Sequence, residues 1–318
     1  MKHDKSKLSV SNLNVRYLES SGRVIKAISS VSLEVRKGES IGIAGESASG
    51  KSTLGSAIMR NLESNARITS GSIYLDDVDI IRLDDKDFDR EIRWKKIAMI
   101  FQGAMNTLDP VFPIGKQMQE ILRSHGVEES LDVRTLASLD EVGLDSSVAK
   151  MYPHELSGGM KQRVVIAMSL LLNPDILIAD EPTTALDVLV QAQIIKLLKS
   201  LKIKRGISIL MISHDLGVIS EIADKVAIMY SGEIVELGNS EDIFSNPKHP
   251  YTQLLISSVP KLESKGTIVS LKGQPPDPAN LPEGCYFLSR CPFAMEACKK
   301  KPSPLSTTGG FVLCWLYK

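Results

Sequence analysis

The stretch that decides the fold is Gly45-Glu46-Ser47-Ala48-Ser49-Gly50-Lys51-Ser52, which fits the pattern G-x-x-x-x-G-K-[ST] at every position. A short apolar run, residues 41–44, precedes it, and residues 54–62 have the spacing of a helix. A strand before the pattern and a helix after it distinguish a phosphate-binding loop from a chance turn of glycine and serine. The glycines let backbone N–H groups surround phosphate oxygens, and the helix N-terminus adds positive potential. We expect Lys51 to reach the β- and γ-phosphates of a nucleotide and the Ser52 hydroxyl to bind Mg²⁺.

On both sides of this loop, short apolar strands alternate with helices. Such an order predicts an α/β fold, in which a parallel sheet is covered by helices on both faces. The spacing between residues 103 and 172 is helical and predicts a helical insert in this sheet. The other expected strands are residues 72–76, 96–101, 176–179 and 208–212, and a long amphipathic helix is expected at 188–204.

The composition is that of an ordered globular protein. The chain has 318 residues, of which 43% are hydrophobic and 24% are charged, which excludes general disorder. Its 38 basic and 38 acidic side chains cancel, so we expect no nucleic-acid partner bound through a positive field over the whole surface. No apolar run reaches 18 residues, and the first residues lead into no apolar signal segment. We therefore expect a protein of the cytosol.

Two adjacent carboxylates, Asp180 and Glu181, end the apolar run of residues 176–179. A buried strand in this place would bring Asp180 to the Mg²⁺ ion beside Ser52. Glu181 would then orient or deprotonate an attacking water molecule. The alternative is an exposed acidic loop, but the preceding apolar strand favours the functional interpretation.

A second glycine-rich turn, Ser157-Gly158-Gly159, precedes a predicted helix. Such a turn presents N–H donors and a hydroxyl group, and can therefore bind an anion. By itself it could equally be a simple helix cap. Together with the phosphate loop, this turn is typical of one family among the proteins that have such a loop.

With these residues the chain resembles ATP-binding cassette subunits over residues 8–238. The resemblance implies a nucleotide-binding domain of residues 1–238. This domain would have a parallel-sheet core, an antiparallel β subdomain and a helical subdomain at about 103–172. It also implies ATP and Mg²⁺ as ligands. It assigns catalysis to Glu181, His214, Gln102 and Lys51, Mg²⁺ binding to Ser52, Gln102 and Asp180, and nucleotide binding to Tyr17, Gly45, Glu46, Ser47, Ala48, Ser49, Gly50, Lys51, Ser52, Thr53, Gln102, Asp180, Ser157, Gly158, Gly159 and Asp187.

The resemblance further implies that a second cassette is needed, because the Ser157 turn of one subunit would close on the γ-phosphate held by the phosphate loop of another. ATP would then join the two subunits, and hydrolysis would release them. An alternative is a non-transport cassette ATPase. Its usual types carry two cassettes or a long coiled-coil insert, and this chain has neither. A degenerate, inactive subunit is disfavoured by Glu181, His214 and the full turn.

Further stretches are similar to the oligopeptide and dipeptide importer subfamily. They are residues 106–110, 152–155, 248–252 and 284–292. The resemblance implies peptide import with a related second cassette, two membrane permeases and an extracytoplasmic binding protein. The protein would lie at the cytoplasmic face of the membrane. Oligosaccharides and nickel complexes stay open as alternative cargo.

The tail, residues 239–318, is expected to be an appended, loop-rich module, since nine of the fifteen prolines lie at or after Pro250. All four cysteines, Cys285, Cys291, Cys298 and Cys314, lie within it. Their spacing, C-x5-C-x6-C-x15-C, fits neither the usual zinc pairs nor the common ferredoxin spacings. The subfamily resemblance implies a 4Fe-4S cluster, with zinc or four unligated thiols as alternatives. No histidine precedes Cys314, where such tails often have one.

Overall fold

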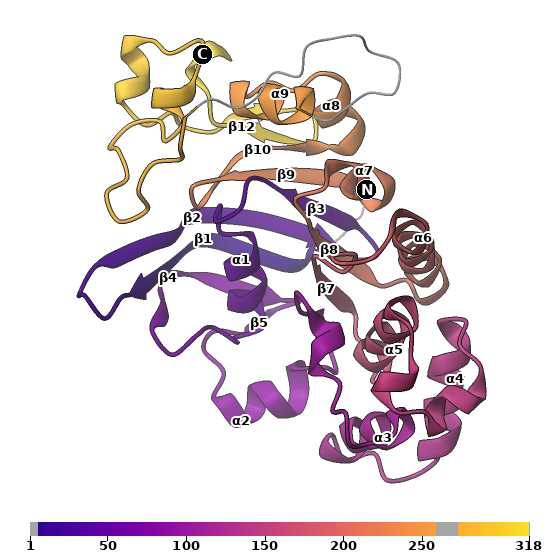
Figure 1. The fold of residues 1–318 in the computed structure, drawn as a ribbon. Helices are drawn as coiled ribbons and strands as arrows, with labels where there is room; N and C mark the ends of the chain where they lie inside the picture. Colours follow the sequence, from indigo (N-terminus) through magenta and orange to yellow (C-terminus); the bar gives the residue numbers. More distant parts are fainter. Residues whose placement is uncertain (1–5, 259–272, 318) are drawn as a thin grey trace, which may run out of the picture. The chain divides into compact units, whose positions relative to one another are not determined.

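The structure is a computed structural model that describes residues 6–258 and 273–317. The chain divides into two compact units. The first unit joins Met1–Ile81 to Met211–Lys318, and the second unit is Arg82–Leu210. Helices and strands of both units are labelled in Figure 1. The domain boundary expected at residue 238 stays a prediction.

An antiparallel sheet in the first unit has the order β2-β1-β4-β5. Its strands are β1 (Ser6–Leu18), β2 (Val24–Arg36), β4 (Ala66–Leu75) and β5 (Val78–Asp79). Alternate side chains of β1 are buried, among them Leu8, Val10 and Val15. One face of the strand therefore packs in the core while the other is more exposed, as a period of two requires.

The remaining strands of the first unit form a second, mixed array in the order β11-β12-β10-β9-β3. Strand β3 (Ser40–Ala44) runs parallel to β9 (Lys225–Tyr230), and all five of its residues are buried. From β9 onward the strands pair antiparallel, through β10 (Glu233–Asn239) to β12 (Gly310–Val312) and β11 (Leu305–Thr307). Figure 1 shows β12 beside β10, so the C-terminal residues extend this sheet.

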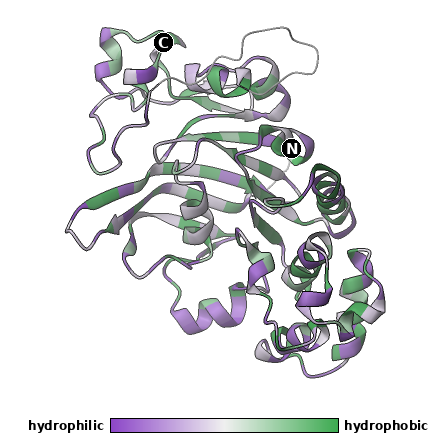
Figure 2. Cartoon of the chain, in the orientation of Figure 1, coloured by the Kyte–Doolittle hydropathy of each residue, from purple (hydrophilic) through white to green (hydrophobic). Residues whose placement is uncertain are grey.

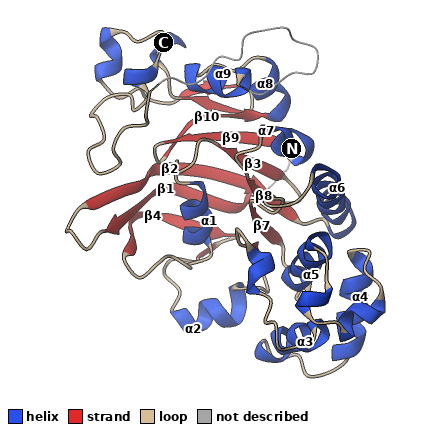
Figure 3. Cartoon of the chain, viewed as in Figure 1, coloured by secondary structure: helices blue, strands red, loops and turns tan. Residues whose placement is uncertain are grey.

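The helices of the first unit are short. They are α1 (Lys51–Ile58), α7 (Leu216–Ile222), α8 (Ser240–Ser245) and α9 (Pro250–Ser257). Among the described tail residues beyond α9, the helical segments are short 3₁₀ turns, and Figure 3 shows the loops that join them. The expected loop-rich texture is confirmed there, but the β11–β12 hairpin was not predicted.

The second unit contains the parallel strands β6 (Ile97–Ile100) and β7 (Ile176–Asp180). Strand β8 (Ser208–Ile212) follows the long helix α6 (Val188–Arg205). The boundary between the two units falls within β8. The expected helical insert is present as α3 (Ile114–Ser124), α4 (Leu131–Glu141) and α5 (Gly158–Leu170). A short helix α2 (Asp85–Asp87) precedes β6 and is strongly hydrophilic in Figure 2.

Helix α6 illustrates how local sequence sets an element's bounds. Asp187 caps its N-terminus by accepting a hydrogen bond from the backbone N–H of Val190 at 3.0 Å. Gly206 ends it in the left-handed conformation, with φ of 65°, which glycine adopts without strain. The predicted range of 188–204 is therefore confirmed to within one residue.

In contrast, the helix expected at residues 54–62 begins and ends earlier, at Lys51 and Ile58. Gly50 takes the left-handed conformation, with φ of 99°, and serves as the cap. The phosphate-loop pattern itself therefore contains the first helical residues.

The buried face of α6 gives a stability prediction. Leu198 is fully buried, whereas Ile203 on the same helix is 81% exposed. We expect Leu198→Ala to lower the free energy of unfolding by about 2–5 kcal/mol, because it leaves a cavity. Ile203→Ala should change it by less than about 0.5 kcal/mol. Urea unfolding of both variants measures the difference, and equal effects would contradict this packing.

Candidate functional site

The phosphate loop connects β3 to α1 within the first unit. Gly45 has a φ of 155°, and a Cβ atom there would strike the carbonyl oxygen of Met229. At Gly50 a Cβ atom would strike the carbonyl oxygen of Ala27. Both glycines are thus required by close backbone approach, which fixes the loop against β9 and β2.

The ammonium group of Lys51 points into this loop. Its Nζ atom donates to the carbonyl oxygens of Gly45 and Glu46, both at 2.8 Å, and the residue is only 6% exposed. A buried cation inside a ring of backbone groups is the charge that a nucleotide's phosphates require. The loop is also fixed from outside, because the N–H of Gly232 donates to the carbonyl oxygen of Ser49 at 3.0 Å.

A cavity of about 250 Å³ opens beside the loop in the same unit. Tyr17 lines it, with its hydroxyl oxygen 3.4 Å from the hydroxyl oxygen of Thr53. The structure therefore brings Tyr17, Thr53 and the phosphate loop together, and their binding of a nucleotide stays a prediction. The cavity suits a base stacked on the tyrosine ring.

A proline-rich segment of the tail closes part of this cavity, which the sequence did not predict. Pro275, Pro276 and Pro278 line it. The segment is held in place because the N–H of Lys26 donates to the carbonyl oxygen of Pro278 at 2.9 Å. Arg23 also donates to both carboxylate oxygens of Asp277, at 3.1 and 2.8 Å. No periodicity or motif in the sequence indicates these contacts.

The two carboxylates lie in the second unit, at the end of β7. Asp180 is 3% exposed. Glu181 follows with a φ of 48°, in the left-handed region that residues other than glycine seldom adopt. Its Oε2 atom accepts hydrogen bonds from Gln102 Nε2 at 3.2 Å and from the Thr184 hydroxyl at 2.9 Å. Gln102 and Glu181 are thus brought together, and Thr184 is a contact that the sequence analysis missed.

The second glycine-rich turn also lies in this unit. The Ser157 hydroxyl caps α5 by accepting from the N–H of Met160 at 3.3 Å. A Cβ atom on Gly159 would lie 2.8 Å from a methyl group of Val190, in the first turn of α6. Gly159 therefore allows the start of α5 to lie against the start of α6, where Asp187 is the cap. Ser157, Gly159 and Asp187 thus share one small region.

Two family models match the chain. One, described as ABC transporter, matches residues 28–184, and the other, described as oligopeptide/dipeptide transporter C-terminal region, matches residues 235–298. The dipeptide transport ATP-binding protein DppD of Bacillus subtilis is 44% identical over 317 residues, which cover 97% of this chain and 94% of that protein. The chain belongs to the ATP-binding cassette family. Within that family it is an ATPase of the oligopeptide/dipeptide transporter type.

Other relatives agree with this membership. The oligopeptide transport ATP-binding protein OppD of Salmonella typhimurium is 44% identical, over 93% of this chain and 89% of that protein. Among solved structures, the dimeric ATP-binding cassette MJ0796, bound to ADP and Pi in a post-hydrolysis state, is 30% identical with a TM-score of 0.65. The matched region covers 73% of this chain and 98% of the MJ0796 chain. The predicted α/β cassette fold is therefore confirmed.

Some site assignments of the cassette remain predictions. Ser52 lies in the first unit and Asp180 in the second, so their joint binding of Mg²⁺ stays a prediction. His214 is exposed and lies between Ser213 and Asp215, the cap of α7. Its catalytic role also stays a prediction.

The four cysteines of the tail converge on one small enclosed cavity, and none forms a disulfide. Burial raises the pKa of Cys285 to about 11, and the three neighbouring thiols add to this shift. Burial likewise raises the pKa of Cys291 and Cys314. Within residues 6–258 and 273–317, no group of three or more His, Cys, Asp or Glu is arranged to hold a metal ion. The predicted cluster or zinc ion therefore receives no support from this geometry.

None of the helices in the described part of the chain is long and apolar enough to cross a bilayer.

The phosphate loop yields a binding prediction. We expect Lys51→Ala to weaken Mg-ADP binding on the order of 100-fold, because a charged hydrogen bond of ~3 kcal/mol is lost. Lys37→Ala, an exposed lysine in the turn before β3, is the matched control and should bind normally. Isothermal titration calorimetry on both variants measures the affinities. Normal binding by Lys51→Ala would contradict the assignment of the loop.

Proposed function

We propose that this chain is the ATP-hydrolysing subunit of an importer for oligopeptides or dipeptides. The observation that carries the proposal is the match of the tail, residues 235–298, to the oligopeptide/dipeptide transporter C-terminal region. That match distinguishes the chain from a general cassette. The relatives named for dipeptide and oligopeptide transport support the same cargo.

Hydrolysis would use the residues that the cassette motifs assign. The base of ATP would stack on Tyr17, and its phosphates would be held by the phosphate loop and Lys51. Ser52 and Asp180 would hold Mg²⁺. Glu181 would orient the attacking water and accept its proton, while its bond to Gln102 keeps the carboxylate in place.

A second cassette would complete the site. The N-terminus of α5, with Ser157 and the two following glycines, has the N–H donors that favour a γ-phosphate from another subunit. Asp187 would lie at the interface with the second cassette. His214 would lie near the γ-phosphate. The dimeric form of the related cassette MJ0796 supports such an arrangement.

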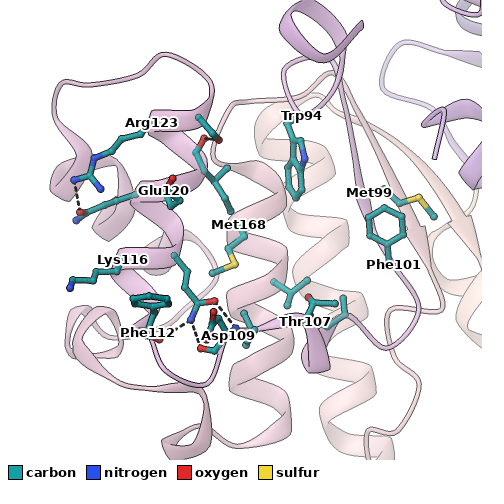
Figure 4. Close-up of a pocket in the computed structure, with 17 residues that line it drawn as sticks. Trp94, Met99, Phe101, Thr107, Asp109, Phe112, Lys116, Glu120, Arg123 and Met168 are labelled. Carbon is teal, nitrogen blue, oxygen red and sulfur yellow. Dashed lines mark hydrogen bonds between the residues drawn. The ribbon is translucent and has the colours of Figure 1, made fainter. Parts of the chain in front are cut away.

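A groove of about 890 Å³ in the second unit is a suitable contact for a membrane permease. Met99, Phe101 and Met168 line it, and Phe112 is 47% exposed at its edge. Asp109, labelled in Figure 4, is fixed by Gln117, which accepts from its backbone N–H at 3.0 Å and donates to its carbonyl oxygen at 2.9 Å. Because Phe101 of this groove directly precedes Gln102 in the chain, a permease bound in the groove would transmit its movement to the site of hydrolysis. We place the subunit at the cytoplasmic face of the membrane, with an extracytoplasmic binding protein delivering the peptide.

The test of this function is peptide-stimulated ATP hydrolysis. The chain is reconstituted in vesicles with its partner cassette, permeases and binding protein, and peptides, oligosaccharides and nickel complexes are compared. We expect only peptides to stimulate hydrolysis and to accumulate inside. Stimulation by sugars or nickel complexes alone would overturn the assigned cargo.

The same system tests the catalytic carboxylate. Glu181→Gln keeps the size and hydrogen bonding of the side chain but cannot accept a proton. We expect turnover to fall by about 10²–10⁴-fold while bound ATP is retained. Unchanged turnover would exclude Glu181 as the base.

We propose that the four cysteines, which line one small cavity, hold a 4Fe-4S cluster as a structural crosslink; the proposal rests on the type of ligand, since their described arrangement is not that of a formed metal site. Thiolate sulfur is the ligand of both iron–sulfur clusters and structural zinc. Cys285, Cys291, Cys298 and Cys314 would hold the cluster, which would crosslink loops that are too poor in apolar residues to fold alone.

Metal analysis tests this cofactor. Protein purified without oxygen should contain about four iron and four sulfide per chain and absorb visible light. Cys298→Ser should lose the iron. Zinc in place of iron would favour the alternative ion, and colourless protein without either metal would exclude both.

A further inference from the structure

Glu46, the second residue of the phosphate loop, has partners at all three of its polar groups. Its carboxylate accepts hydrogen bonds from both terminal nitrogens of Arg290, at 2.7 and 2.9 Å. Its backbone N–H donates to the hydroxyl oxygen of Tyr251 at 2.8 Å. Its carbonyl oxygen accepts from Lys51 Nζ, also at 2.8 Å. Two of these partners come from the C-terminal part of the chain.

Arg290 is held firmly in the place from which it binds Glu46. Its side chain is 3% exposed, and that of Glu46 is 26% exposed. The guanidinium group lies over the rings of Tyr230 and Phe287, at 5.7 and 5.9 Å, and it also donates to the Tyr230 hydroxyl at 3.2 Å. A guanidinium fork that binds a carboxylate through two bonds fixes its orientation as well as its distance.

Tyr251 fixes the same loop from a second element, helix α9. The residue is fully buried, and its ring lies 4.7 Å from that of Tyr230 and 5.4 Å from that of Phe287. Burial raises the pKa of its phenol, so the hydroxyl stays protonated at neutral pH. Glu46 is thus held by two side chains that share one aromatic cluster.

We propose that Arg290 is a positioning residue for nucleotide binding. By fixing the carboxylate of Glu46 it also fixes the carbonyl oxygen that binds Lys51, so the affinity of the loop for nucleotide depends on the C-terminal extension. The inference rests on the proposed nucleotide-binding role of the loop. It adds to that role a residue far away in the sequence.

The test is a comparison of nucleotide affinity and catalysis in the full-length chain. Arg290→Met removes the charge and both hydrogen bonds but keeps much of the apolar stem. We expect its Kd for Mg-ADP to rise about tenfold, equal to ~1.4 kcal/mol. The KM for ATP should rise in proportion, while kcat changes less than about twofold, because Arg290 does not touch the reacting atoms.

A double-mutant cycle with Glu46→Gln shows whether Arg290 acts through Glu46. If it does, the double variant should bind Mg-ADP no more weakly than Arg290→Met alone. Arg290→Lys, which keeps the charge but not the fork, should have an intermediate Kd.

The matched control is Lys301→Gln. Lys301 of the extension forms an ion pair with the buried Glu233 of β10, and neither side chain lines the cavity beside the phosphate loop. We expect the control to lower the melting temperature without changing the Kd for Mg-ADP. It therefore separates loosening of the extension from loss of loop positioning.

Three results would overturn the proposal: an unchanged Kd in Arg290→Met, equal weakening in Lys301→Gln, or additive effects with Glu46→Gln. If Arg290→Met fails to fold, the affinities of Arg290→Lys and Glu46→Gln for Mg-ADP are measured in the same assay instead. Normal affinity in both variants would overturn the proposal. Absence of Mg-ADP binding by the unaltered chain would overturn the proposed function as well. Normal binding by that chain with no effect of Arg290→Met would overturn this inference alone.

Discussion

A phosphate-binding loop must leave several backbone N–H groups for a ligand to take. Although the N–H of Glu46 donates to Tyr251, most of the contacts that fix this loop therefore use its carbonyl oxygens and side chains. Here the carbonyl oxygens of Gly45 and Glu46 bind Lys51, and that of Ser49 accepts from Gly232. The carboxylate of Glu46 binds Arg290. Strands and loops around the phosphate loop supply these contacts, among them residues of the C-terminal extension.

The buried apolar strands and the capped helix α6 were the most predictable elements, whereas α1 was expected three to four residues too late. Strand β8 has the predicted bounds, and α6 and β7 differ by one residue, because buried apolar runs and helix caps are local signals. The β11–β12 hairpin was missed, since strands of three residues are too short to show alternation. The bond between Gln102 and Glu181 fits their predicted roles, whereas the bond between Thr184 and Glu181 has no sequence signature.

The contacts of the tail were the least predictable part of the site. The cysteines and prolines marked the tail as unusual, but not which residues of it meet the phosphate loop. Pairing of Arg290 with Glu46 depends on the folded path of the chain, and no local pattern specifies a partner so distant. The proline-rich segment beside Tyr17 is a similar case, held by one backbone bond and one exposed ion pair. Such contacts determine which residues of the tail lie against the phosphate loop and Tyr17.

The distance in sequence between Glu46 and Arg290, 244 residues, has a consequence for synthesis. At roughly 5–20 residues per second, the ribosome adds Arg290 about 12–50 s after Glu46. During that interval the nascent chain holds a phosphate loop without its C-terminal brace. If Arg290 positions the loop as proposed, nucleotide affinity reaches its final value only after the tail has folded back on β9 and β10. A chain truncated before the tail would carry the full loop motif and still lack this brace.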